Sequence, residues 1–293
     1  MPTINQANVS GSEVRKILIP IVSKKIQEDV ADIFNKAIAA IRKSEASYVQ
    51  AKKILESELG LDRLHFQKPM GYLAQFSEVE VSRRCDSDYF QPKYRQLDTM
   101  AAKYPVARIK MLAEKLETGL YSPSYTLDGK PYIRGCNISA GYIENEGMLK
   151  SKAIAITPNA IVKEDDILVT RVGSIGVCGI VERELSGSLF SDNLIRIRLT
   201  EKIKKTLSPH CFNLLLNTTY GQMQMVRYSR GSVQQRLNQS QLAQIPIPCI
   251  GWDAQQEIEK NLLKHRSAKK DSVWLLAEAK ARVEQLIEEA VAK

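Results

Sequence analysis

Two stretches of the chain share one pattern of apolar positions. From Gln27 and again from Gln255, apolar or small residues recur every three or four positions. This spacing puts them on a narrow helical face, as in a coiled coil, and neither 27–59 nor 255–293 contains Gly or Pro. The pattern predicts two long helices that pack together in antiparallel orientation. Three polar residues in this face are expected to weaken the contact but to fix its register: Ser44, His265 and Ser272.

The two helices belong to an internal repeat. Residues 12–60 align without a gap to residues 240–288, with 11 of 49 positions identical. Each copy opens on a short apolar segment with proline, at 17–20 and 245–248, which is typical of a strand edge or end. The repeat predicts a duplicated element with a domain inserted between the copies. The alternative is two unrelated surface helices that resemble each other through low complexity.

Between the helices the pattern changes to short β-rich runs separated by turn signals. A helix is predicted at 208–227, where apolar residues fall near helical spacing. Strands are predicted at 131–134, 153–156, 166–171, 175–182 and 193–199. The expected fold class is therefore α+β: a mixed α/β domain flanked by two long antiparallel coiled-coil helices.

The charge balance favours an anionic partner, with nucleic acid first. The formal net charge is +9, in a chain of ordinary globular composition with 44% hydrophobic and 26% charged residues. Residues 202–252 contain no Asp or Glu but six Lys and Arg residues. An unopposed basic stretch suits contact with phosphates, although a solvated basic surface is the alternative.

No motif for chemistry occurs. The five cysteines are at least 33 residues apart and form no Cys-x-x-Cys, which predicts reduced thiols rather than zinc or disulfides. There is no Walker A loop, Gly-x-Gly-x-x-Gly sequence or nucleophile elbow. We therefore expect no catalytic residues, no metal and no cofactor. The chain also lacks a run of 18 apolar residues and a secretory signal, so we expect a cytoplasmic protein without a membrane partner.

Three segments, at 132–143, 166–176 and 227–238, combine Arg with Asn, Gln or Ser beside Gly. Arg can read guanine, Asn or Gln can read adenine, and Gly lets the backbone approach a phosphate. The candidate DNA-binding residues are Arg134, Asn137, Arg171, Ser174, Arg227, Arg230, Ser232, Gln234 and Gln235.

Some of these features also have a purely structural interpretation. Gly173, Gly176 and Gly179 equally suit a hairpin with tight turns. Arg196 and Arg198 alternate with apolar residues, so we expect them on the solvent-facing side of a strand.

The same segments resemble the specificity (S) subunits of type I restriction-modification systems. The resemblance covers nearly the whole chain and rests on loose motifs that are specific together. They are 132–143, 166–176, Ser-Asp-Asn-Leu-Ile-Arg-Ile-Arg at 191–198, Leu216-Asn217 with Gly221-Gln222, Gly-Ser-Val-Gln-Gln-Arg-Leu-Asn at 231–238, Ile-Pro-Ile-Pro at 245–248, Gln255 with its helix, and the connector at 88–94.

The resemblance implies a non-catalytic subunit whose target recognition domain binds half of a split site in double-stranded DNA. Its spacer helices would dock DNA methyltransferase (modification) subunits, and the restriction subunit would join the complex. Family members alternate two target domains with two helices, whereas this sequence shows helix, domain, helix. A second copy or a split partner half would then supply the other target domain.

The resemblance also implies the domain limits. They are 1–20 for the tail of a preceding target domain, 21–60 for the first spacer helix, 61–105 for a connector, 106–248 for the target recognition domain and 249–293 for the second spacer helix. Two alternatives remain open at this point. One is a coiled-coil scaffold that binds protein partners without DNA specificity, and the other is a nuclease or methyltransferase with an unfamiliar site.

Overall fold

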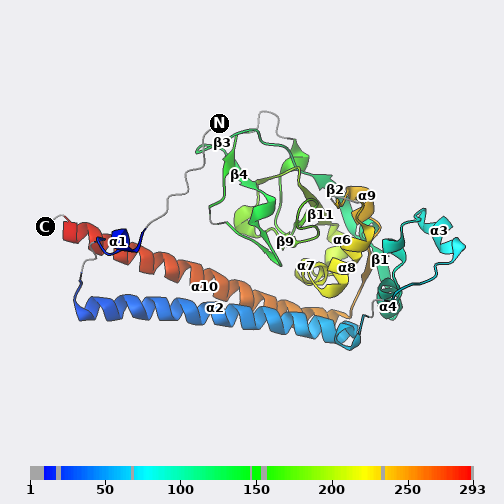
Figure 1. Ribbon diagram of the computed structural model, residues 1–293, viewed down its shortest axis with the longest axis horizontal. Helices are drawn as coiled ribbons and strands as arrows, with labels where there is room; N and C mark the ends of the chain where they lie inside the picture. Colours follow the sequence, from blue (N-terminus) through cyan, green and yellow to red (C-terminus); the bar gives the residue numbers. More distant parts are fainter. Residues whose placement is uncertain are drawn as a thin grey trace. The chain divides into compact units, whose positions relative to one another are not determined.

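The computed structural model describes residues 10–17, 21–66, 69–145, 147–152, 157–231 and 235–291. The chain forms two compact units, one of residues 1–47 and 264–293 and one of residues 48–263. Two long helices, α2 (Lys24–Leu59) and α10 (Trp252–Val291), each contribute to both units (Figure 1). The two predicted long helices are therefore confirmed.

Contacts within each unit show that these helices run antiparallel. In the smaller unit, Ser44 Oγ lies 2.9 Å from His265 Nδ1. In the larger unit, Leu55 of α2 and Ile258 of α10 belong to one buried cluster. Residue numbers rise along α2 as their partners' numbers fall along α10, which defines the antiparallel orientation. Two of the three polar residues expected in the seam, Ser44 and His265, thus form a hydrogen bond between the helices.

The duplication is visible in the way both helices begin. Gln27 Nε2 donates to the carbonyl of Val22 at 2.8 Å, and Gln255 Nε2 donates to that of Ile250 at 2.9 Å. Both bonds reach back five residues, so the two aligned glutamines perform the same N-terminal role. Gly60 ends α2 in the left-handed conformation with φ 72°, where a side chain would add strain.

The described residues of the 48–263 unit form two four-stranded sheets and two short ribbons. The first sheet is antiparallel and has the order β2 (Ala113–Thr118), β11 (Leu194–Leu199), β8 (Ile167–Thr170), β9 (Cys178–Ile180). The second has the order β10 (Leu189–Phe190), β4 (Lys130–Ile133), β7 (Lys150–Ser151), β3 (Tyr125–Thr126). The ribbons pair β1 (Val106–Arg108) with β12 (Pro246–Pro248) and β5 (Ile138–Ser139) with β6 (Tyr142–Ile143).

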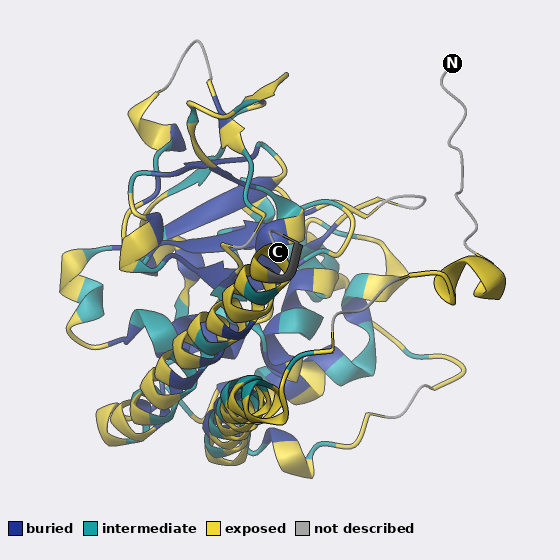
Figure 2. Cartoon of the chain, turned by 90° about the vertical axis from the view of Figure 1, so that its left-hand side faces the viewer, coloured by how far each residue is buried: buried dark blue, intermediate teal, exposed yellow. Residues whose placement is uncertain are grey.

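Helices of this unit pack against the first sheet, whose strands are largely buried (Figure 2). They are α4 (Pro92–Ala101), α5 (Ile109–Leu112), α6 (Glu201–Lys204), α7 (Pro209–Leu216), α8 (Thr219–Tyr228) and α9 (Gln239–Leu242). The helix α3 (Phe76–Ser82) has no buried residue, and α1 (Gly11–Val14) belongs to the smaller unit. The main buried cluster joins α4, α7 and α8 to the sheet through Leu97, Phe212 and Tyr220. The mixed α/β domain predicted between the long helices is confirmed.

The predicted helix at 208–227 is two helices, α7 and α8. The break falls at Asn217, whose Nδ2 donates to the carbonyls of Asn213 and Cys178. A Cβ on Gly221 would lie 2.4 Å from the Leu216 carbonyl oxygen, so glycine lets α8 start directly against the end of α7. The apolar spacing did not reveal this break, because it depends on side-chain hydrogen bonds to β9.

Strands occur at four of the five predicted positions. The predicted strand at 153–156 lies outside the described residues, as does most of the predicted one at 17–20. The repeat equivalent of 17–20 is β12, which pairs antiparallel with β1.

Gly173 and Gly176 have φ of 77° and 85° in the link between β8 and β9, so the structural interpretation of these two glycines as tight turns is confirmed.

Candidate nucleic-acid interface

A turn at residues 191–193 joins three parts of the 48–263 unit. The amide of Ser191 donates to the carbonyl of Ile133, at the end of β4, at 2.9 Å. The amide of Asp192 donates to the carbonyl of Leu120 at 3.1 Å. The turn therefore fixes the start of the first candidate segment (132–143), where Ile133 precedes Arg134.

The second and third segments meet the same turn. The amide of Arg171 donates to the carbonyl of Asn193 at 3.1 Å, and its Nη1 lies 3.3 Å from the carbonyl oxygen of Asp192. The carbonyl of Arg171 in turn accepts from the amide of Leu237 at 3.1 Å. The fold thus brings three segments, far apart in sequence, to one edge of the domain.

The third segment is a loop closed at its base. Arg230 and Arg236 exchange two backbone hydrogen bonds of 3.0 and 2.8 Å. Arg230 and Gln235 are exposed, whereas Leu237, which follows, is fully buried. Ser232 and Gln234, both predicted DNA contacts, lie outside the described residues.

Arg134 and Asn137 differ in how far their side chains are available to contact a ligand. The Arg134 guanidinium lies 5.5 Å from the centre of the Tyr125 ring, within cation–π range. Asn137 is 5% exposed, and its Oδ1 accepts from the amide of Arg134 at 3.0 Å. Asn137 therefore closes a turn inside the domain, and its placement differs from the predicted role in DNA contact. Ser174 is exposed in the turn after β8.

Arg227 also differs from the prediction. Its Nη1 donates to both carboxylate oxygens of Asp98 at 3.0 and 2.8 Å, and its Nε donates to the carbonyl of Tyr89 at 3.2 Å. Its guanidinium lies 4.6 Å from the Tyr89 ring centre and 5.1 Å from that of Tyr94. Arg227 therefore fastens α8 to α4 and the preceding turn instead of facing a ligand.

The acid-free stretch at 202–252 is less basic in space than in sequence. Asp98 neutralises Arg227, and Lys204 Nζ lies 3.0 Å from Glu201 and 3.4 Å from Asp165. Acids from elsewhere in the chain thus supply the missing negative charge. Lys202, Lys205, Arg230 and Arg236 of this stretch are exposed.

The expectation that Arg196 and Arg198 face solvent is wrong. Arg196 is 3% exposed, and the Arg198 side chain is 18% exposed. Arg198 donates to Asp166 at 2.7 and 2.6 Å, and Arg196 Nη1 donates to the carbonyls of Asn159 and Ile161 at 2.9 Å each. Burial lowers the pKa of Arg196, whereas hydrogen bonding to Asp166 raises the pKa of Arg198. A second layer covers this side of the strand, so its alternating polar residues form a buried ion network.

The described residues hold no cluster of three or more His, Cys, Asp or Glu side chains placed for a metal ion. Burial raises the pKa of Cys211 to about 12 and also raises that of Cys178, so neither is a thiolate near neutral pH.

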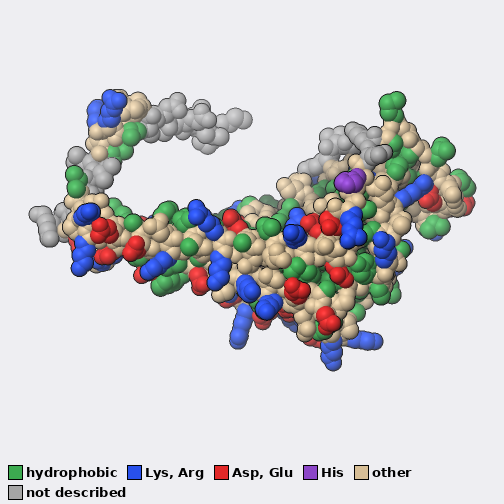
Figure 3. Space-filling model, turned by 90° about the horizontal axis from the view of Figure 1, so that it is seen from below, with side chains coloured by type: hydrophobic (Ala, Val, Ile, Leu, Met, Phe, Trp, Pro, Cys, Tyr) green, Lys and Arg blue, Asp and Glu red, His purple; other side chains and the backbone are tan. Residues whose placement is uncertain are grey.

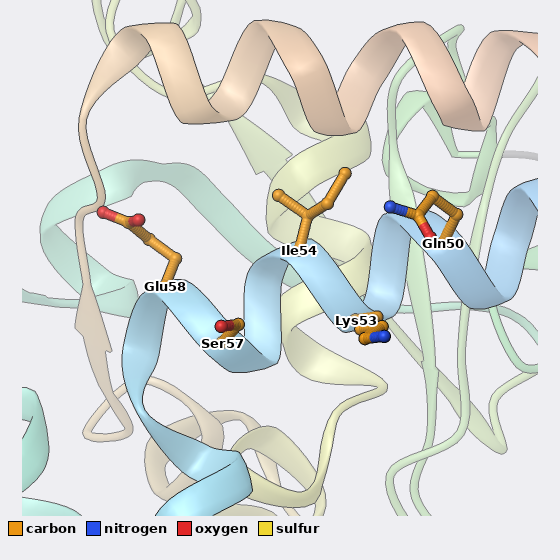
Figure 4. Close-up of a pocket in the computed structure, with 5 residues that line it drawn as sticks. All are labelled: Gln50, Lys53, Ile54, Ser57 and Glu58. Atoms are coloured by element: carbon orange, nitrogen blue, oxygen red, sulfur yellow. The ribbon is translucent and has the colours of Figure 1, made fainter.

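A shallow groove is lined by one face of α2 alone, through Gln50, Lys53, Ile54, Ser57 and Glu58 (Figure 4). Within the described ranges, no helix is long and apolar enough to cross a membrane.

The comparison with protein families decides the identity. A family described as "Type I restriction modification DNA specificity domain" matches residues 91–269, more than half of the chain. The chain belongs to this family. The matched range contains all three candidate segments and the 191–193 turn that joins them. No curated protein sequence matches the chain.

Two solved structures of type I specificity subunits are similar to the chain at low identity. The HsdS subunit from Thermoanaerobacter tengcongensis is 11% identical with a TM-score of 0.40, over 97% of this chain and 64% of that one. The type I restriction-modification S subunit from M. genitalium is 13% identical with a TM-score of 0.47, over 95% and 65%. The specificity-domain chain thus spans just under two thirds of the chains it matches.

Sequence reasoning missed several residues of this edge. Asp192 and Asn193 are part of the 191–198 motif, but nothing in the motif marked them as the junction of the three segments. Tyr121 and Tyr125 are 72% and 46% exposed, an unusual position for large aromatic side chains. The sequence contained a signal for this surface, because Tyr121 and Tyr125 lie on either side of Pro123 with no Asp or Glu between them.

Proposed function

We propose that the chain is the sequence-recognition subunit of a type I restriction-modification complex in the cytoplasm. Its 48–263 unit binds one half-site of double-stranded DNA, and methylation and cleavage belong to partner chains. The observation that carries the proposal is the junction at 191–193, which gathers Arg134, Arg171 and the Arg230 loop at one edge of a domain of the specificity family.

The proposed base readers are those whose polar groups are not fully used inside the protein. Arg134 and Arg171 are partly exposed, although the Nε of each is buried and has no hydrogen-bond partner among the described residues. Arg230, Gln235 and Ser174 are exposed, and Ser232 and Gln234, which lie outside the described residues, are also proposed as readers. Asn137 and Arg227 are left out because their side chains hold the fold together.

The long helices are the proposed docking site for methyltransferase subunits. Along them, Lys and Arg alternate with Asp and Glu, and ion pairs such as Lys24–Glu28 and Lys280–Glu284 form (Figure 3). A surface that mixes both charges in this way does not favour a polyanion such as DNA. α10 also exposes Val273 by 51% and Trp274 by 64%, and aromatic side chains are enriched in protein interfaces. The restriction subunit, and a second copy or split partner half with another target domain, complete the proposed complex.

The proposed function predicts salt-sensitive DNA binding by the full chain. Contact with about five phosphates should give a slope of roughly −4 to −5 when the logarithm of the binding constant is plotted against that of the salt concentration. Replacing Arg230 by Gln should weaken binding to the preferred duplex by about 1–3 kcal/mol, as expected for a base reader. Fluorescence anisotropy with labelled duplex measures both. Absence of duplex binding at low salt, with and without the methyltransferase subunit, would favour the protein scaffold instead.

A further inference from the structure

A three-stranded ribbon lies beside the candidate edge. β3 and β4 flank a turn at 127–129, and both pair antiparallel with β7. Figure 1 shows β3 and β4 at the margin of the 48–263 unit. Ile133 at the end of β4 binds the 191–193 turn, so the ribbon continues directly into the edge that carries Arg134 and Arg171.

The base of this ribbon is firmly built. A Cβ on Gly129 would lie 2.4 Å from the carbonyl oxygen of Ser151, so glycine lets the turn pack against β7. Ser151 is 1% exposed, and its hydroxyl lies 2.6 Å from that of Ser122. Tyr132 donates its hydroxyl to the carbonyl of Leu120 at 2.8 Å. The ribbon therefore presents its tip from a fixed base.

Large apolar side chains are exposed at the tip and in the segment that leads to it. Leu127 is 89% exposed, Tyr121 is 72% exposed and Tyr125 is 46% exposed. Grouped exposure of this kind marks a binding surface more often than chance.

Cations surround this tip. Lys130, Lys150 and Lys152 are exposed and form no ion pair within the described part of the chain, and Arg134 lies over Tyr125. Asp128 is the single acid in 119–134, and 147–152 contains none. Lysine is depleted in protein–protein interfaces, whereas it is a common phosphate contact in DNA complexes. The charge therefore favours DNA over a protein as the occupant.

We propose that the β3–β4–β7 ribbon enters the major groove of the DNA half-site. The 127–129 turn is the part that enters, and apolar side chains in that groove contact the methyl group of thymine. Leu127, Tyr121 and Tyr125 contact base edges, and Lys130, Lys150 and Lys152 contact the flanking phosphates. The inference rests on the proposed function and assigns part of its sequence preference to residues outside the three Arg-bearing segments.

The test compares Leu127→Ser with Leu73→Ser in the full chain bound to its methyltransferase subunit. Both leucines are 89% exposed in the same unit, so loss of apolar surface is matched. Leu127→Ser should weaken binding to the preferred duplex by about 5- to 150-fold and relax preference at one or two adjacent base pairs. Leu73→Ser should change neither. Sequencing of duplexes selected from a randomised pool reads the preference.

A second pair of variants separates phosphate contact from base contact. Lys130→Gln with Lys150→Gln should weaken binding to all sequences and make the salt slope shallower by about 2, while Lys103→Gln leaves it unchanged. If the wild-type complex selects a sequence and the Leu127→Ser and Tyr121→Ser complexes select the same one with equal affinity, the ribbon inference is overturned and the proposed function stands. If the wild-type complex does not bind duplex DNA, the proposed function itself fails.

Discussion

Replacing Asp166 by Asn is expected to lower the free energy of unfolding by about 3–5 kcal/mol, the usual cost of removing one partner from a buried ion pair. The Asp166 side chain is 1% exposed and accepts from Arg198 at 2.7 and 2.6 Å and from the Lys163 amide at 2.7 Å. Arg196 Nε also lies 3.9 Å from its carboxylate. Without that charge, two largely buried guanidinium groups lose their counter-ion.

The neighbouring residue provides the control. Asp165 has φ 68°, a left-handed conformation that Asn adopts readily, and its side chain is 31% exposed. Its ion pair with Lys204 is partly solvated, so Asp165→Asn should cost no more than about 1 kcal/mol. Urea unfolding followed by circular dichroism compares the two variants. Equal losses of stability would contradict the assignment of Asp166 as the counter-ion of both arginines.

Replacing Ala37 by Glu is expected to open the helix pair of the smaller unit and to abolish methyltransferase docking. Ala37 is 0% exposed, and a carboxylate buried there without a partner costs several kcal/mol. Ala39 is exposed on the same helix, so Ala39→Glu introduces the same charge without burial. The control should keep wild-type helicity, melting temperature and docking.

The Ala37→Glu defect should also depend on pH. Burial raises the pKa of a carboxyl group in the folded state above its unfolded value, so the folded state holds its proton more tightly. The stability deficit is therefore smallest near pH 4 and grows as the pH rises toward about 7. Circular dichroism melts across this range, with co-purification of the methyltransferase at neutral pH, measure both effects. Unchanged melting and docking would contradict the spacer-helix account.

The helix pair was predictable because its determinants are local. A long stretch without Gly or Pro and a regular apolar spacing define each helix, and the duplication marks equivalent residues. Gln27 and Gln255 align in sequence and make the same backward hydrogen bond. Ser44 and His265 were both expected in the seam, and the structure adds that they contact each other.

The candidate site was harder to predict because its determinants are distant in sequence. Arg227 has the residue type and neighbours of a DNA contact, but Asp98, 129 residues away, binds its guanidinium. Arg196 and Arg198 follow the alternation of a half-exposed strand, yet Asp166 provides a buried counter-ion. Sequence patterning reports which face a residue occupies and not whether another layer covers that face.

The three segments picked out from the sequence nevertheless come together in the structure. Arg134, Arg171 and the 230–236 loop converge because backbone groups at 191–193 and at Leu237 link them. Their side-chain types could be read from the sequence, whereas their convergence required the fold. The exposed ribbon tip with Leu127 was not apparent, since an apolar residue in a turn has no periodic pattern to mark it.

The central claim, that this edge of the 48–263 unit recognises a DNA sequence, is tested most directly by sequence selection. The full chain is co-purified with its methyltransferase subunit, mixed with randomised duplex DNA, and the retained molecules are sequenced. The account predicts enrichment of a defined half-site, with preference relaxed at one position in Arg171→Ala, at a cost of about 1–3 kcal/mol on the preferred site. Equal retention of all sequences by the wild-type complex would contradict it.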